Sequence, residues 1–455
     1  MRTRLNITTK TVYGAIPGSS DYNNTAQFIA IRNVIEAMTE GSYVWNKTRG
    51  FIYYWSSGGA PADARVTVAS TLLRLGTEST PNDAANWVTF KNLIVEGARR
   101  AGIAADHVRG LRIEECELRN FGWVACAIRD STRVSIIGGS IHDGASRALT
   151  LHGGDEQTLT PAGNIIDGTE IYEIGYDLNA EISTALSTSR GYGSVPSTRE
   201  GCGLTIRNVH MHDIRDGLIS ATMAKLVIED CLFERFLTIT GDAGGITGAF
   251  RFTQPDNVIR RCTFRNARRL SLHNQSLGAT VAIYLDMLWG WTLEDNSFTN
   301  LDQAIYAGGK HHTIRRNTFS GCSLGHWGAA IVVLPRQGHV SSTSVPRLAL
   351  EEDLAAAPLT AVPWSSGFPQ LRNYRAGGSL NFLLGYHEET RIVDNVARES
   401  GSKLLRIYPQ DTQTTYNGYS VGIDMQQKNY PSGSTATPVD GGGSVALQTV
   451  SRIAQ

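Results

Sequence analysis

Four aspartates lie beside short apolar segments, in positions where carboxyl groups could perform acid–base chemistry. Asp216, Asp242 and Asp302 each come just before an apolar segment, and Asp286 stands at the end of a predicted strand AIYL (282–285). If these segments are neighbouring strands in register, two of the carboxyl groups can lie close enough to couple. Coupling raises the pKa of one group above that of the other, so that one can act as an acid and the other as a base. The alternative for Asp216 and Asp302 is a turn aspartate that hydrogen-bonds to its own backbone.

The surroundings of two of these aspartates point to a sugar. Asp242 lies in TGDAGG (240–245), where glycines allow the backbone to approach a ligand closely. Asp286 lies close to Trp289 and Trp291, and an aromatic face beside an acid offers a sugar ring both stacking and hydrogen bonding. The sequence therefore predicts a carbohydrate site in which Asp242, Asp286, Asp302 and Asp216 are the candidate catalytic residues.

Aromatic and histidine side chains are the candidates for holding the substrate. Residues 322–380 contain a helical segment (348–358) and an aromatic, Pro-containing loop, and interrupt the repeat described below. We expect this stretch to form one wall of a cleft. The alternative for Trp364 is packing of the loop on the core. Adjacent His311 and His312 would point to opposite faces of a strand, so we expect no metal site and no cofactor. The candidate substrate-binding residues are Tyr284, Trp289, His326, Trp327, Trp364 and His273.

A repeat of 21 to 23 residues positions these groups. In its frame an apolar residue stands three before and two after a reference position, as Leu293 and Phe298 stand around Asn296. This period with such short strands favours a β-solenoid, in which each coil needs a neighbour on its open edges. Leucine-rich repeats have a similar period but require a density of leucine that this chain lacks. The reference positions are Leu93, Cys116, Gly139, Thr169, Val209, Cys231, Cys262, Asn296, Asn317 and Asn395.

The frame also predicts the interior of the tube. The apolar residues at both positions should point inward, and stacked asparagines at the reference position can form an amide ladder in which cysteine replaces asparagine as a small hydrophobe. Ten coils at ~4.8 Å each give a tube of roughly 48 Å. We expect a cap over 1–80 (a helix at 24–38 and a hairpin at 42–55), coils over 81–410 with insertions at 153–164, 176–201 and 322–380, and a cap or tail over 411–455.

Composition and charge limit the kinds of partner that this chain is expected to bind. The formal net charge is zero, which leaves no electrostatic footprint for nucleic acid or an anionic membrane, and no apolar run approaches the ~18 residues of a bilayer span. Six cysteines form no CxxC pair, which favours buried free thiols over disulfides or zinc. The first twenty residues lack the apolar region of a signal peptide, so we expect either no export or a leader removed before Met1. The oligomeric state stays open.

Five segments follow one another in a recognisable order: GGDEQTLTPAGN (153–164), GDAGGITGAF (241–250), AIYLD (282–286), AIYAGGKHHTIRRNTFSGC (304–322) and EEDLAAAPLTAVPWSSGFPQL (351–371). Their order and spacing resemble a known family. The right-handed parallel β-helix glycoside hydrolases, in the branch with β-xylosidases and fucose-acting enzymes, are similar over roughly 43–400. The resemblance implies an all-β, right-handed parallel β-helix of about ten coils with a small α/β N-terminal cap, an extracellular or periplasmic location, and Asp242 and Asp286 as the catalytic pair. Met287 stands where those relatives have a second acid, and Arg215-Asp216-Gly217 where they carry His.

The chemistry implied is hydrolysis of a glycosidic bond by two carboxyl groups, with retention at a separation of ~5 Å and inversion at ~6.5–9.5 Å. With Ile246 and Ile283 in register, Asp242 and Asp286 lie seven strand positions apart, ~23 Å on a straight strand. This distance is too long for a catalytic pair. Either the glycine loop around Asp242 folds back over the strand and brings Asp242 to Asp286, or Asp242 pairs instead with Asp216 or Asp302. The alternatives are a polysaccharide lyase on the same fold and a non-catalytic carbohydrate-binding or fibre protein.

Overall fold

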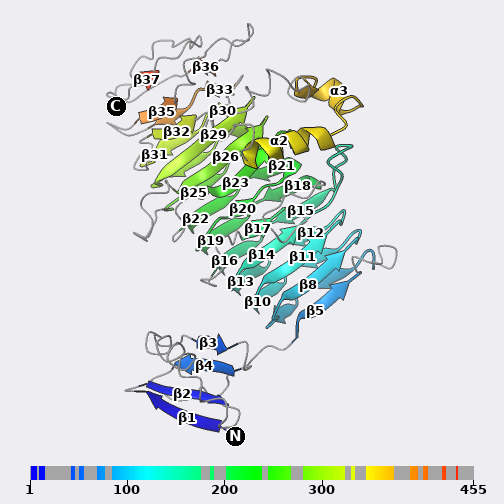
Figure 1. Cartoon of the computed structure of the whole chain (residues 1–455), viewed down its shortest axis with the longest axis vertical. Helices are drawn as coiled ribbons and strands as arrows, with labels where there is room; N and C mark the ends of the chain where they lie inside the picture. The colour runs from blue at the N-terminus through cyan, green and yellow to red at the C-terminus, as the bar shows by residue number, and fades with distance from the viewer. Residues whose placement is uncertain are drawn as a thin grey trace. The chain divides into compact units, whose positions relative to one another are not determined.

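The computed structural model describes the central part of the chain almost continuously and its ends only in part (Figure 1). The described residues are 2–7, 10–15, 43–46, 51–55, 69–76, 85–175, 185–188, 201–237, 244–267, 280–322, 329–333, 345–372, 390–397, 403–407, 423–426 and 437–438. The chain divides into two compact units, Met1–Thr67 and Val68–Gln455.

The first unit is a small antiparallel sheet. Its strands are β1 (Arg2–Ile7), β2 (Lys10–Ala15), β3 (Tyr43–Asn46) and β4 (Phe51–Trp55), in the spatial order β1-β2-β4-β3. Strands β3 and β4 are the two arms of a hairpin in which Trp45 is paired with Ile52. The helix expected at 24–38 lies outside the described residues.

The second unit is a right-handed parallel β-helix, as predicted, and three parallel sheets form its walls (Figure 1). Each coil contributes one strand to each sheet in turn.
The 11-stranded sheet contains β6 (Thr89–Lys91), β9 (Arg112–Glu114), β12 (Ser135–Ile137), β15 (Asn164–Asp167), β18 (Gly201–Arg207), β21 (Met223–Glu229), β24 (Val258–Arg260), β27 (Thr292–Glu294), β30 (Thr313–Arg315), β33 (Thr390–Val393) and β36 (Ile423–Gln426).
The 10-stranded sheet contains β7 (Ile94–Glu96), β10 (Glu117–Phe121), β13 (Ser140–Gly144), β16 (Glu170–Ile174), β19 (His210–Ile214), β22 (Leu232–Phe236), β25 (Thr263–Arg265), β28 (Ser297–Thr299), β31 (Thr318–Ser320) and β34 (Val396–Ala397).
The 12-stranded sheet contains β5 (Thr71–Leu75), β8 (Ala101–Asp106), β11 (Val124–Arg129), β14 (Arg147–Leu151), β17 (Leu186–Ser187), β20 (Ile219–Ser220), β23 (Gly244–Arg251), β26 (Val281–Trp289), β29 (Gln303–Lys310), β32 (Ala329–Val333), β35 (Lys403–Ile407) and β37 (Thr437–Pro438).

The repeat frame read from the sequence is the register of the coils. Residues three before the reference position pair with one another in the 11-stranded sheet, as Ile113 pairs with Ile136. Residues two after it pair in the 10-stranded sheet, as Leu118 pairs with Ile141. These positions are buried in every frame except at the two ends, where Phe90 and Ala397 are only partly buried. The apolar spacing therefore predicted the inward-facing rows correctly.

The interior contains the predicted amide ladder and, in addition, a stack of phenylalanine rings. The amide oxygen of Asn317 accepts hydrogen bonds from the backbone and side-chain amides of Asn296, at 3.0 Å each, and Asn395 accepts the same pair from Asn317. Phe233, Phe264, Phe298 and Phe319 continue a stack with ring centroids 4.9, 5.0 and 5.0 Å apart. All six cysteines are free and buried, as predicted. Each coil thus extends the pattern of the coil before it.

Two helices pack outside the tube. Helix α2 (Val345–Ala356) covers the expected helical segment, and the short α3 (Trp364–Gly367) follows it. Together with residues from β18, β21, β23 and β26 they form a second apolar cluster, separate from the tube's core. No helix in the described ranges has the length and apolar character needed to cross a bilayer.

The amide ladder makes a testable contribution to stability. Asn317 is fully buried, and its side chain also donates to the carbonyl of Leu293 at 3.0 Å. The change Asn317→Ala leaves buried amide and carbonyl groups without partners, and we expect it to lower the free energy of unfolding by about 2–4 kcal/mol. Denaturant or thermal unfolding would measure this, with Thr313→Ala on the outer face of β30 as the control. A loss as small as that of the control would contradict the structural role of the ladder.

Candidate functional site

Every long connection between the described strands of the β-helix has one end at the 12-stranded sheet. Between the 11-stranded and 10-stranded sheets the chain always turns in two residues, as at 115–116 and 295–296. The connections that lead into or out of the 12-stranded sheet are far more variable and include 152–163, 175–185, 188–200, 266–280 and 334–389. Insertions therefore leave the coil where strands of the 12-stranded sheet begin or end, which makes the outer face of this sheet the natural place for a site.

Asp286 lies on that outer face, within β26. Leu285 points into the core, so its neighbours Tyr284 and Asp286 point outward, and both are buried at 8% and 6% exposure. The ring of Tyr284 lies 4.6 Å from that of Tyr306 on the next strand. Ile246 and Ile283 are in register, and Ala249 is the residue opposite Asp286.

The sequence-based boundary at Asp286 was wrong. We expected the strand to end at Leu285, but β26 runs on to Trp289 through a bulge between Leu285 and Leu288. Met287 adopts a φ of 59° there, and Gly308 faces the bulge. A Cβ on Gly308 would lie 3.0 Å from the Leu285 carbonyl oxygen, so glycine allows the two strands this close approach.

The residue after Asp286 packs in an apolar environment. Met287 is 1% exposed and belongs to the second apolar cluster, together with Phe252 and Trp289. An acid at this position would enter that cluster without an obvious partner, at a high desolvation cost.

Asp216 and Asp302 lie at the other end of the strands. Each stands three residues before the central apolar residue of its strand, Ile219 or Ile305, and two strands separate them. Three strand spacings of ~4.8 Å place their backbones ~14 Å apart. Asp302 accepts a hydrogen bond from the hydroxyl of Thr280 at 2.7 Å. These two acids are therefore not a coupled pair with each other, and Asp302 lies about six strand positions, ~20 Å, from the level of Asp286.

Four of the predicted site residues lie outside the described part of the chain. They are Asp242, His273, His326 and Trp327. Asp242 belongs to the connection before β23, His273 to the connection before β26, and His326 and Trp327 to the connection before β32. All four therefore belong to connections that enter the 12-stranded sheet.

Two of the three predicted tryptophans, Trp289 and Trp364, are buried packing residues in this structure. Trp364 is fully buried, and its indole N–H donates to the carbonyl of Gln157 at 2.6 Å. Trp289 is 4% exposed, 3.9 Å from the ring of His311 and 5.9 Å from that of Phe252. Packing of the aromatic loop on the tube, the alternative reading for Trp364, is what the structure shows. Neither indole face is open to a sugar in this conformation.

A buried charged cluster joins the second apolar cluster to the tube, and sequence reasoning missed it. Arg251, at the end of β23, donates to both carboxylate oxygens of Glu156 at 3.0 Å and pairs with Asp353 of α2 at 2.7 Å. The Thr253 hydroxyl bridges the two acids, and the backbone N–H groups of Phe252 and Thr253 donate to Asp353. Burial, more than the neighbouring Asp353, raises the pKa of Glu156 to about 6, although Arg251 opposes the shift.

The adjacent histidines do not form a metal site together. His312 is fully buried, its Nδ1 accepts from the backbone N–H of Trp291 at 3.3 Å, and its Nε2 donates to the carbonyl of Gly308 at 3.0 Å. Burial lowers its pKa to about 4, so the ring is neutral at physiological pH. His311 instead lies against Trp289. His312 thus supports the strand that faces the bulge.

Comparison with known proteins adds little to this picture. The chain matches no protein-family model and no curated protein. A solved structure titled "Glycoside hydrolase" is similar with a TM-score of 0.38 and 9% identity, over 65% of this chain and 56% of that one, so the match spans little more than half of its length. Similarity at this level carries no functional argument. The fold places the chain among the right-handed parallel β-helix proteins, and its activity has to be argued from its own residues.

The buried cluster predicts a pH-dependent stability. The folded chain holds the Glu156 proton more tightly, with a pKa of about 6 against an ordinary value of 4.5. The free energy of unfolding should therefore fall as pH rises from about 4.5 to 6, by up to about 2 kcal/mol, and then level off. In Glu156→Gln this part of the pH dependence should vanish, as Tm measured across pH 4–7 would reveal. Glu352→Gln, an exposed change on α2, is the control, and an unaltered profile in Glu156→Gln would contradict the assignment.

Proposed function

We propose that this protein is a glycoside hydrolase that cleaves a polysaccharide or oligosaccharide with two carboxyl groups, one of which is Asp286. The observation that carries the proposal is the place of Asp286: an acid on the outer face of the 12-stranded sheet, beside the Tyr284–Tyr306 ring pair, where the chain's long connections enter and leave. An elongated face of stacked coils suits an extended polymer. A carboxyl group on this face can donate or accept a proton at one glycosidic bond of such a polymer.

The second carboxyl group is proposed to be Asp242. Asp302 is hydrogen-bonded to Thr280 at the far end of the strands, ~20 Å from the level of Asp286, so it is a poor partner. Asp242 precedes β23, the strand paired with β26, and the glycines around it suit a connection that turns back over the sheet. One acid would protonate the leaving oxygen, and the other would attack the anomeric carbon or activate water.

The test is glycoside turnover by matched variants. Wild-type protein is screened against aryl xylosides, fucosides, arabinosides and galactosides, and against polysaccharides by release of reducing ends. Asp286→Asn and Asp242→Asn should each lower kcat by about 10²–10⁴-fold, because each removes a proton donor or acceptor at the reacting bond. The control is Asp295→Asn, an exposed change in a two-residue turn away from this face, where Asn tolerates the positive φ of 57°.

The other outcomes are equally specific. Loss of turnover in Asp216→Asn but not in Asp286→Asn would move the catalytic pair to the other end of the strands. An unsaturated product that absorbs in the ultraviolet would mean a lyase. Binding of a polysaccharide without any cleavage would mean a carbohydrate-binding or fibre protein, and would overturn the proposal.

A further inference from the structure

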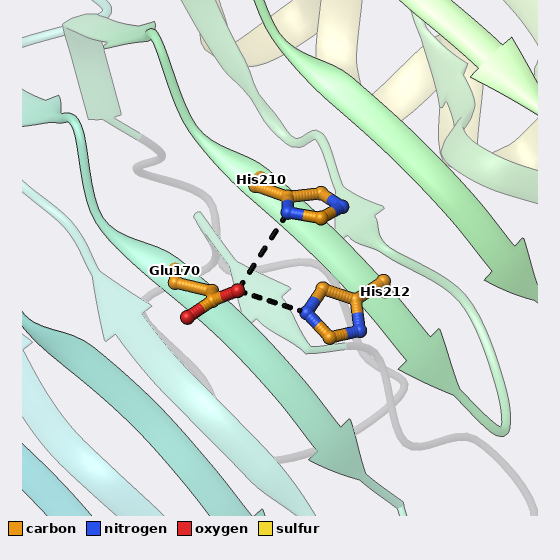
Figure 2. Close-up of side chains that lie close together, drawn as sticks. All are labelled: Glu170, His210 and His212. Carbon is orange, nitrogen blue, oxygen red and sulfur yellow. Dashed lines mark hydrogen bonds and ion pairs between the residues drawn. The ribbon is translucent and has the colours of Figure 1, made fainter.

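Two histidines and a glutamate converge on the outer face of the 10-stranded sheet, away from the residues discussed so far. His210 and His212 are two residues apart on β19, so their side chains leave the same face of the strand, while Met211 between them is buried in the core. Glu170 on β16 is paired in register with His210. Figure 2 shows the Glu170 carboxylate directed toward both imidazole rings.

The distances suit one shared ion. A carboxylate oxygen of Glu170 lies 3.2 Å from Nε2 of His212 and 3.7 Å from Nδ1 of His210. One ligand atom from each of the three residues lies within 4.8 Å of the other two. Tetrahedral ligands at ~2.0–2.1 Å from zinc are about 3.3 Å apart. Small side-chain rotations would therefore bring all three atoms to bonding distance of one ion.

In each histidine, the ring nitrogen that faces away from Glu170 lies beside a second carboxylate. Nδ1 of His212 lies 2.6 Å from a carboxylate oxygen of Asp213, which Arg235 holds in turn at 2.7 and 2.8 Å. Nε2 of His210 lies 3.2 Å from a carboxylate oxygen of Glu234. A neutral imidazole that donates from one nitrogen presents a lone pair on the other, and metal-binding histidines commonly have such a carboxylate partner. In both rings the nitrogen left for bonding is the one that faces Glu170.

We propose that Glu170, His210 and His212 bind one divalent transition-metal ion, for which Zn²⁺ is the best fit. Two imidazoles and a carboxylate are ligands that zinc and its first-row neighbours prefer, whereas Ca²⁺ and Mg²⁺ prefer oxygen alone. The side chains of Glu170 and His210 are 50% and 34% exposed, so an ion can enter and water can complete its coordination. Three protein ligands with a remaining open position are typical of reactive rather than purely structural zinc sites.

The competing reading is a cluster of imidazolium–carboxylate ion pairs. Protonated His210 and His212 would satisfy the same distances by donating to Glu170, Asp213 and Glu234. This arrangement needs two positive rings, and it would bind no metal at neutral pH. The two readings therefore differ in a direct binding measurement.

The experiment uses the full chain without an affinity tag, freed of metal with a chelator and dialysed at pH 7.5. Titration calorimetry with Zn²⁺ should show a site that is lost, by one ion per chain or at least tenfold in affinity, in both His210→Asn and Glu170→Gln. Co²⁺ bound to the wild type should give the visible absorption of a low-coordinate ion, and this band should disappear in both variants. Added Zn²⁺ should raise the Tm of the wild type more than that of either variant.

His142→Asn is the matched control. His142 lies on the same face, on β13, and stacks on Tyr172 at 4.6 Å, but it is not one of the three converging residues. This variant should keep the zinc site. The proposal is overturned if the wild type binds no Zn²⁺, or if the two test variants fold with wild-type Tm in chelator and retain the wild-type number of bound ions and the Co²⁺ spectrum.

Discussion

The structure depends on the pairing of each coil with the coil on either side. An isolated coil leaves every strand with two open edges, so the backbone hydrogen bonds of this unit come from parallel neighbours in all three sheets. Side chains inside the tube follow the same rule, since the amide of Asn317 is bonded to Asn296 on one side and Asn395 on the other. Residue types whose side chains can bond or stack with an identical residue therefore recur at the same position in successive coils.

Charge on the outside reinforces the same register. Where strands of the 11-stranded sheet end, four successive coils alternate acidic and basic pairs at 229–230, 260–261, 294–295 and 315–316. Arg261 therefore bonds Asp230 in the coil before it, and Arg316 bonds Asp295. The guanidinium groups lower the pKa of both aspartates. Exposed pairs of this kind add little stability individually. A shift by one coil, however, would place like charges opposite each other, so the alternation favours one stacking order.

The sequence predicted the structural features that recur in every coil, but it did not reveal features that occur only once in the chain. The apolar frame around Asn296 predicted the coil register because the inward rows must be apolar in every coil. The strand end at Asp286 was misplaced because a bulge at Met287, opposite Gly308, continues the strand where the repeat gives no signal. The Glu156–Arg251–Asp353 cluster joins residues about a hundred positions apart, and no local pattern encodes that contact.

The sequence already contains the pattern of the proposed metal site, but our prediction considered His311 and His312 instead of His210 and His212. His311 and His312 are adjacent in the connection between β29 and β30 and contact different partners, whereas His210 and His212 have the spacing of two that keeps both on one face of β19. The further step was to use the register: 170 and 210 both stand one residue after their reference positions, 169 and 209, so the frame already places Glu170 beside His210. An in-register parallel sheet brings equivalent outward positions of successive coils within ~4.8 Å, close to the separation of two ligands on one ion. On this fold, outward His, Asp and Glu at the same frame position in successive coils are therefore the pattern to search for, and it differs in kind from the inward pattern that defines the fold.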